Sequence, residues 1–153
     1  MAAIEDRLAE LGLVLPDVAK PAGAYVPAVV TGHLVFTAGQ LPSVGGALPA
    51  TGKVGATVTP EAAKEYAATC VLNALAAAKA AIGSLDRIVR VVKVVGFVAS
   101  DPSFTGQAGV INGASELLGS VFGASGEHAR SAVGVAVLPL DAPVEVEFVF
   151  EFA

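Results

Sequence analysis

The stretch 127–147 places one arginine in a setting that suits a bound anion. Along the strand that this stretch predicts, Arg130 shares a face with three very small residues, Ala132, Gly134 and Ala136. Small side chains beside one arginine leave open volume next to a positive charge, and a guanidinium can grip a planar carboxylate with two hydrogen bonds. The pattern therefore indicates a carboxylate site. Two alternatives stay open: a structural ion pair between Arg130 and an acidic neighbour, and a glycine that close packing requires.

The opposite face of that strand carries Val133, Val135 and Val137, which we expect in a core. The last strand has an acidic face made by Glu145, Glu147 and Glu151. Three carboxylates can simply form a solvated face, but Glu145 follows directly after a turn and could border a pocket. If Leu138 faces Val144, Arg130 lies on the face opposite Glu145. The two could then meet only after a register shift or across a subunit boundary.

The other chemistry-bearing residues form no constellation for a metal or a nucleophile. His33 and His128 lie far apart in the sequence, and Cys70 is the only cysteine. Cys70 falls in the middle of an expected helix and is predicted to be a small buried residue. Ser131 has no histidine at the spacing of a serine triad. We therefore expect no metal site.

Strand-like and helix-like segments alternate along the chain. The spacing of Ile4, Leu8, Leu11 and Leu15 predicts a short amphipathic helix that ends near Gly12, within an N-terminal extension 1–20. Thr59 as N-cap, Pro60 at the first position and a stop at Gly83 predict a helix over 60–82. The remaining predictions are strands at 24–30 and 33–38 joined by Thr31-Gly32, a loop at 41–52, a short strand at 53–57, a long central strand at 87–99, a helix from Asp101-Pro102 to about Phe122, and strands at 129–138 and 144–152.

This order predicts one domain over 1–153 with an α+β fold, in which a sheet carries both long helices on one face. Hydrophobic residues make up 54% of the chain, more than one monomer's interior is expected to hold, which indicates an oligomer interface. Prolines, glycines and charges interrupt every long apolar run, so no membrane span is expected. The net charge of −5 argues against nucleic acid as a partner. The first residues lack the basic region of a secretory signal, which favours a cytoplasmic protein.

Three stretches together resemble the Rid/YjgF family, also called the endoribonuclease L-PSP family. The carboxy-terminal stretch matches at Ala129-Arg130-Ser131, Leu138-Pro139 and Val144-Glu145-Val146-Glu147. A second match joins Gly23-Ala24-Tyr25 to Phe36-Thr37-Ala38-Gly39-Gln40-Leu41-Pro42, and a third is Asn112 after Val95-Gly96-Phe97-Val98. The resemblance covers roughly 21–153, and the early helix is similar to that of a longer branch of the family.

The resemblance implies a chorismate-mutase-like fold with a mixed sheet, and a homotrimer that binds small carboxylates in clefts between subunits. It implies hydrolysis of reactive enamines and imines, such as 2-aminoacrylate, to a 2-keto acid and ammonia, without metal or cofactor. By position, Arg130 would hold the substrate carboxylate and Glu145 would position or activate water. The Gly39 backbone would bind polar atoms, and Tyr25 and Asn112 would line the cleft.

This chain departs from the family's pattern at two positions of the expected cleft. Many active members carry a serine where this chain has Ala38 and a cysteine where it has Ala132. Both replacements remove polar side chains and widen the cleft, which puts the identity of the substrate in question. Three functions are consistent with the resemblance: an imine deaminase, a trimeric protein that binds a small carboxylate without efficient turnover, and a ribonuclease, against which the acidic net charge argues.

Overall fold

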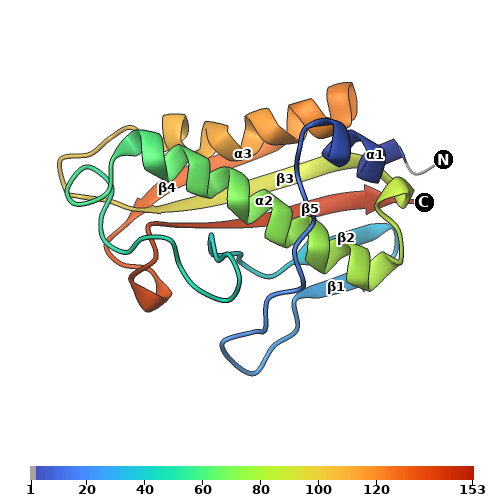
Figure 1. The fold of residues 1–153 in the computed structure, drawn as a ribbon, viewed down its shortest axis with the longest axis horizontal. Helices are drawn as coiled ribbons and strands as arrows, with labels where there is room; N and C mark the ends of the chain where they lie inside the picture. The colour runs from blue at the N-terminus through green and yellow to red at the C-terminus, as the bar shows by residue number, and fades with distance from the viewer. Residues whose placement is uncertain (1–2) are drawn as a thin grey trace.

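The computed structural model describes residues 3–153, in which helices and strands follow one another as Figure 1 shows. The helices are α1 (Ala3–Glu10), α2 (Pro60–Ile82) and α3 (Gln107–Phe122). The strands are β1 (Ala28–Thr31), β2 (Leu34–Thr37), β3 (Ile88–Ala99), β4 (Ala129–Val135) and β5 (Val144–Phe152). Within 3–153, no helix has the length and hydrophobicity that crossing a bilayer requires.

The strands form one mixed sheet in the order β1-β2-β5-β3-β4. β1 and β2 form an antiparallel hairpin, and β5 lies between β2 and β3, antiparallel to both. β4 pairs in parallel with β3, and α3 supplies the crossover that a parallel pair requires. The last two strands are therefore not neighbours, and Leu138 does not face Val144. Pairing between distant segments has placed β3 between them.

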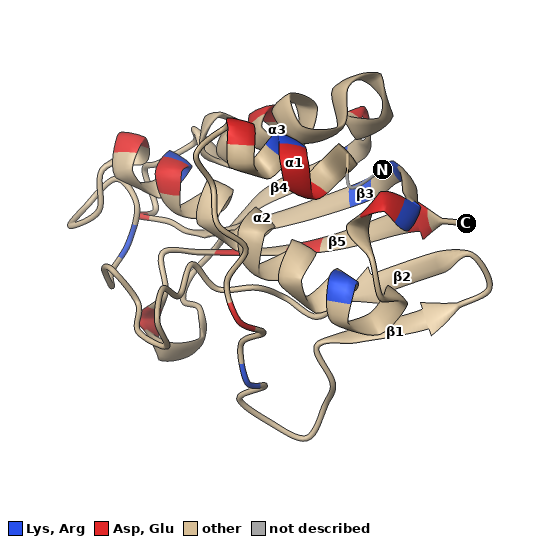
Figure 2. Cartoon of the chain, turned by 45° about the vertical axis from the view of Figure 1, so that its right-hand side comes forward, with Lys and Arg blue, Asp and Glu red and all other residues tan. Residues whose placement is uncertain are grey.

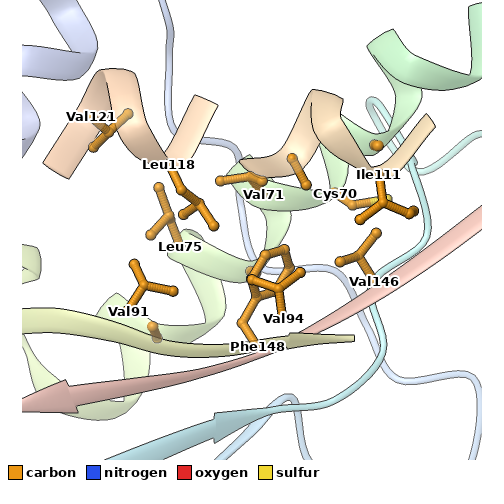
Figure 3. Packing of buried hydrophobic residues seen from close by; sticks show 14 of the residues in the cluster. Cys70, Val71, Leu75, Val91, Val94, Ile111, Leu118, Val121, Val146 and Phe148 are labelled. Carbon is orange, nitrogen blue, oxygen red and sulfur yellow. The ribbon is translucent and has the colours of Figure 1, made fainter. Parts of the chain in front are cut away.

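Both long helices cover the same face of the sheet, as predicted. α2 packs on β2 and β5, while α3 packs on β3 and β4 (Figure 1). In Figure 3, Leu75 of α2 and Leu118 of α3 point toward Val94 and Phe148 of the sheet. All four side chains are buried, and the ring of Phe148 stacks on that of Phe150 with centroids 5.8 Å apart. This layer of apolar contacts is the core that holds α3 over β4.

Local signals set the ends of α2. The Thr59 hydroxyl accepts a hydrogen bond from the Ala62 amide at 3.1 Å, and Pro60 is the first helical residue. Gly83 follows the last residue with a φ of 91°, a conformation that favours glycine. The prediction of a helix over 60–82 is confirmed. Cys70, on this helix, is fully buried as predicted, and burial followed by the charge of Glu145 raises the pKa of its thiol.

The sheet face that points away from the helices has no cover within 3–153. By the register of the strands it carries Val29, Phe36, Val149, Val95, Phe97 and Val133. Val29, Phe36 and Val133 are 53%, 42% and 44% exposed, a large apolar area for a molecule in water. The valines of β4 therefore do not enter this chain's core, contrary to prediction. The Arg130 face of β4 meets α3 instead, because its small residues let the helix approach closely.

Several predicted element ends are wrong, for local reasons. The first helix ends at Glu10, close to Gly12 as predicted, but residues 13–27 are irregular, so the first strand starts only at residue 28. The hairpin turn consists of Gly32 and His33. Residues 53–57 contribute only isolated bridges. The second long helix starts at residue 107, because the Asp101 carboxylate accepts from the amide and hydroxyl of Ser103 and closes a turn there. The strand after it ends at residue 135.

Candidate functional site

Three neutral oxygens from α3 hold the guanidinium of Arg130. Arg130 Nη1 donates to Asn112 Oδ1 at 2.8 Å and to Ser115 Oγ at 3.2 Å, and Nη2 donates to the carbonyl oxygen of Ala108 at 3.3 Å. β4 brings the arginine to this helix because Arg130 and Val94 are paired across the sheet and share the face that α3 covers. The structure thus brings together Arg130 and Asn112, two residues that the sequence predicted for one site.

No carboxylate neutralises Arg130 within residues 3–153. The ion pairs among these residues are Arg7–Glu10, Lys53–Asp141, Lys64–Glu116 and Lys79–Glu5. The alternative of a structural ion pair for Arg130 is therefore wrong within this part of the chain. A guanidinium has five N–H donors, and three are used here, so two remain free for a planar anion.

The small residues beside Arg130 leave less open space than the sequence indicated. A Cβ added to Gly134 would come within 2.8 Å of Gln107 Nε2 and 3.1 Å of Ser100 Oγ. Gln107 donates to the Ser100 hydroxyl at 3.1 Å and so fills this part of the face. A larger residue at position 134 would have to displace the movable end of Gln107, so the second alternative, a glycine that close packing requires, stays open.

Glu145 lies on the other face of the sheet. In the ladder between β3 and β5 it pairs with Phe97, three residues after Val94, the partner of Arg130. An odd spacing along a strand reverses the face, so Arg130 and Glu145 of one chain point in opposite directions. The sequence had left open how they could meet. No shift of register brings them together here.

The carboxylate of Glu145 is half-buried and accepts no hydrogen bond from residues 3–153. Burial raises its pKa, and the nearby charge of Glu147 raises it further. Both effects disfavour the ionised form, so Glu145 binds a proton more tightly than an ordinary glutamate does. A half-buried carboxylate without a partner is suited to take a proton from water and to return it.

Gly39 lies directly against Glu145. A Cβ at position 39 would come within 2.8 Å of Glu145 Cδ and Oε2, so only glycine leaves the carboxylate where it is. The neighbouring amides of Ala38 and Gln40 donate to the carbonyl oxygens of Pro27 and Val146. Within 3–153 the Gly39 amide donates to no acceptor. The structure therefore joins Gly39 and Glu145 and leaves one free N–H beside the carboxylate.

Tyr25 lies with Gly39 at a cavity of about 830 Å³. The cavity opens between the irregular segment 16–22 and the loop that begins at Ala38, and Asn73 supports that loop by donating to the carbonyl oxygens of Leu41 and Ser43. The Tyr25 hydroxyl accepts from the Ala22 amide at 3.1 Å, and the ring is half exposed. Arg130, Asn112 and Glu145 do not line this cavity. In one chain the five predicted residues thus form two groups, Arg130 with Asn112, and Gly39 with Tyr25 and Glu145.

Sequence reasoning missed Ser115 and His128. Ser115 Oγ lies 2.8 Å from His128 Nε2, and the same oxygen accepts from Arg130. A signal was available for Ser115, because it follows Asn112 by three residues and so shares its helix face. His128 precedes Arg130 by two residues, but only the packing of α3 on β4 brings it to Ser115.

Charged residues are spread thinly over the described part of the chain. In Figure 2, lysines and arginines are scattered over several elements, and most of the ribbon carries neither charge. Within 3–153, no three histidine, cysteine or acidic side chains gather as metal ligands would. The groups that this arrangement offers for chemistry are Arg130, Glu145 and the free N–H of Gly39.

Comparison with known proteins identifies the family of this chain. Residues 5–153 match the family described as "YjgF/chorismate mutase-like, putative endoribonuclease". The chain is 48% identical over 148 residues to protein TCP17 of Trypanosoma cruzi, covering 95% of this chain and 91% of that protein. The crystal structure of Atu1372 from Agrobacterium tumefaciens, a protein of unknown function, is similar with a TM-score of 0.91 and 47% identity, over 99% of this chain and 93% of that one. A Shewanella oneidensis protein, also described as a "putative endoribonuclease", has a TM-score of 0.95 and 33% identity, over 98% and 99% of the two chains. The chain therefore belongs to the YjgF/chorismate mutase-like family.

Proposed function

We propose that this protein hydrolyses small 2-imino acids and their enamine tautomers to 2-keto acids and ammonia. One observation carries the proposal: Arg130 is held by three neutral oxygens, carries no counter-charge within 3–153, and keeps two donors free. That is the arrangement a substrate carboxylate needs. Glu145, which has a raised pKa and no hydrogen-bond partner within 3–153, supplies the proton chemistry.

The proposed site lies between subunits of a homotrimer. Arg130 and Glu145 point to opposite faces of one sheet, so a single chain cannot aim both at one small substrate. A neighbouring copy can supply the second group, and the uncovered apolar face of the sheet provides the surface for association. The cleft then combines Arg130 and Asn112 of one subunit with Glu145, Gly39 and Tyr25 of the next.

In this site the reaction needs only water and proton transfer. Arg130 holds the carboxylate while the oxygen of a water molecule bonds to the imine carbon and the C=N electron pair moves to nitrogen. Glu145 accepts a proton from that water and passes it to the nitrogen. The resulting hydroxyl gives up its proton to Glu145, which passes it to the nitrogen; the C–N bond then breaks, ammonia leaves, and the electron pair of the O–H bond forms the carbonyl of the keto acid. Because imines of this kind hydrolyse readily by themselves, orientation and one base suffice.

A binding protein without efficient turnover is the second candidate. Ala38 and Ala132 stand where many active family members carry polar side chains, which favours a cleft poorer in proton-transferring groups. The two candidates differ in one measurement, the release of ammonia and keto acid from a freshly generated 2-imino acid. A deaminase accelerates it at catalytic concentration, whereas a binding protein slows it or leaves it unchanged. The Glu145→Gln variant serves as the inactive control. In a ribonuclease assay, cleavage that is equally fast with this variant comes from a contaminating enzyme.

The assembly gives a first prediction. Sedimentation equilibrium near neutral pH is expected to yield about three times the chain mass of 15.2 kDa, because the apolar sheet face is stable in water only when covered. Val133→Lys, which places a charge on that face, is expected to weaken the assembly. A wild-type protein that stays monomeric at micromolar concentration would rule out a site shared between subunits.

Gly39 gives a second prediction. Gly39→Ala should fold normally, since the atoms its Cβ would meet belong to the movable end of the Glu145 side chain. Displacing that carboxylate is expected to lower kcat roughly 10- to 100-fold. Gly119→Ala is the matched control, because a Cβ at this exposed position on α3 meets nothing within 4 Å. Equal kcat values for Gly39→Ala and wild type would show that the contact between Gly39 and Glu145 is unimportant.

A further inference from the structure

Four groups around Arg130 are linked by hydrogen bonds whose direction can be assigned. His128 Nδ1 lies 2.6 Å from the carbonyl oxygen of Gly126, which can only accept, so Nδ1 carries a proton. In the neutral ring Nε2 is then an acceptor, and the Ser115 hydroxyl, 2.8 Å away, must donate to it. The lone pairs of Ser115 Oγ are left to accept from Arg130 Nη1 at 3.2 Å. Every donor in this chain points the same way, from Arg130 through Ser115 and His128 to Gly126.

We propose that Ser115 and His128 are positioning residues that fix the guanidinium of Arg130 for its anion. A serine hydroxyl rotates freely and could otherwise turn its proton toward the arginine. His128 removes that freedom by taking the proton, which keeps an acceptor facing Nη1. Hydrogen bonds linked head to tail also polarise one another. The role deepens the proposed function and rests on it, since it takes Arg130 as the group that binds the substrate carboxylate.

The remaining contacts explain why this pair matters for binding. Asn112 Oδ1 and Ser115 Oγ both accept from Nη1, and together they define the plane of the guanidinium. The two free donors then point in one direction before a ligand arrives, so less freedom is lost on binding. Without Ser115 the guanidinium keeps its charge and its bonds to Asn112 and Ala108, but its orientation is less restricted. Binding of a planar carboxylate should therefore weaken, while proton transfer at Glu145, on the other sheet face, should not change.

The test compares Ser115→Ala, His128→Leu and His128→Gln in titrations with 2-ketobutyrate. Ser115→Ala and His128→Leu are each expected to raise Kd about 3- to 10-fold. Gln should lie between Leu and wild type, because its side-chain oxygen can accept from Ser115. In the deaminase assay KM should rise by a similar factor at nearly unchanged kcat, a split that general damage to the fold would not give. Ser120→Ala and His33→Leu, exposed residues outside the site, are the matched controls and should leave Kd unchanged.

Two further comparisons isolate the route through Arg130. The double variant Ser115→Ala/His128→Leu should bind 2-ketobutyrate no more weakly than the single variant with the higher Kd, because both changes interrupt the same series of hydrogen bonds. In an Arg130→Ala background neither change should alter Kd further. Additive effects, or effects that persist without Arg130, would overturn the proposal, and Ser115→Ala decides the matter if His128→Leu does not fold. Covalent labelling of Ser115 by a sulfonyl fluoride would also overturn it, because a nucleophilic serine would then be the better reading.

A measurement without ligand separates this proposal from the proposed function. In ¹⁵N spectra of the arginine side chains, the Nη groups of Arg130 should give separate signals in the wild type, because hydrogen bonds hinder their rotation. Ser115→Ala should average them, and Arg130→Lys assigns them. If the wild type gives separate signals and Ser115→Ala averages them, while Arg130→Ala binds 2-ketobutyrate normally, the proposed function is disproved and the positioning role is supported. Averaged Nη signals in the wild type would disprove the positioning role, whatever the result of the enzyme assay.

Discussion

Arg130→Ala is expected to raise the Kd for pyruvate or 2-ketobutyrate by roughly 10- to 100-fold, because a charge-assisted contact of this kind contributes about 1.5–3 kcal/mol. The guanidinium offers two free N–H donors to the carboxylate, and no other cation contacts Asn112 or Ser115 within 3–153. Arg130→Lys should recover only part of the affinity. An ammonium is a point donor, and it can neither replace the planar fork nor keep all three contacts to α3.

Isothermal titration of the keto acids, with trimer state and thermal unfolding followed in parallel, measures this effect. Arg7→Ala is the matched control, because it removes the same charge from α1, where the side chain pairs with Glu10. Its Kd should equal that of the wild type. An Arg130→Ala protein that is folded, assembled and still binds as tightly as the wild type would disprove the carboxylate site.

Glu145→Gln is expected to lower kcat by roughly 10²-fold while leaving the assembly and the binding of keto acids intact. An amide cannot accept the proton that water gives up when its oxygen bonds to the imine carbon. The side chain keeps nearly the same volume against Gly39, so the close packing there is preserved. Ammonia release, corrected for spontaneous hydrolysis, measures the loss. Turnover at the wild-type rate would make Glu145 a structural residue.

The pH dependence of kcat/KM, measured for the wild type and for Glu147→Gln, tests the role of the ionised Glu145 carboxylate. Burial and Glu147 raise the pKa of Glu145 above the ordinary 4.5, and the ionised form is the one that accepts a proton. Therefore kcat/KM should reach its full value above this raised pKa and fall as the pH drops through it. The fall should occur at a higher pH than it would with a glutamate of ordinary pKa. Glu147→Gln removes the like charge and should move this limb to lower pH. Because burial is the larger cause, part of the shift should remain.

The sequence by itself determined the features that depend on neighbouring residues. Thr59, Pro60 and Gly83 define α2 through bonds and angles within a few residues of each end. The alternation of side chains along a strand separated Arg130 from the Val133 face, and Glu145 from Phe148, before any fold was known. The family's signature residues are read in the same local way. These residues also predicted an arginine and a glutamate as the chemical groups of the site.

Only the tertiary structure decided which of these groups meet. Pairing of β3 with both β4 and β5 put Arg130 and Glu145 on opposite faces with a strand between them, and strand pairing depends on contacts far apart in the sequence. The packing of α3 on β4 brought Ser115 and His128 to the arginine, and no carboxylate of residues 3–153 pairs with it. It also filled the space beside Gly134 with Gln107. Side-chain type and spacing fix the direction of a group within its own element, whereas its neighbours depend on how whole elements pack.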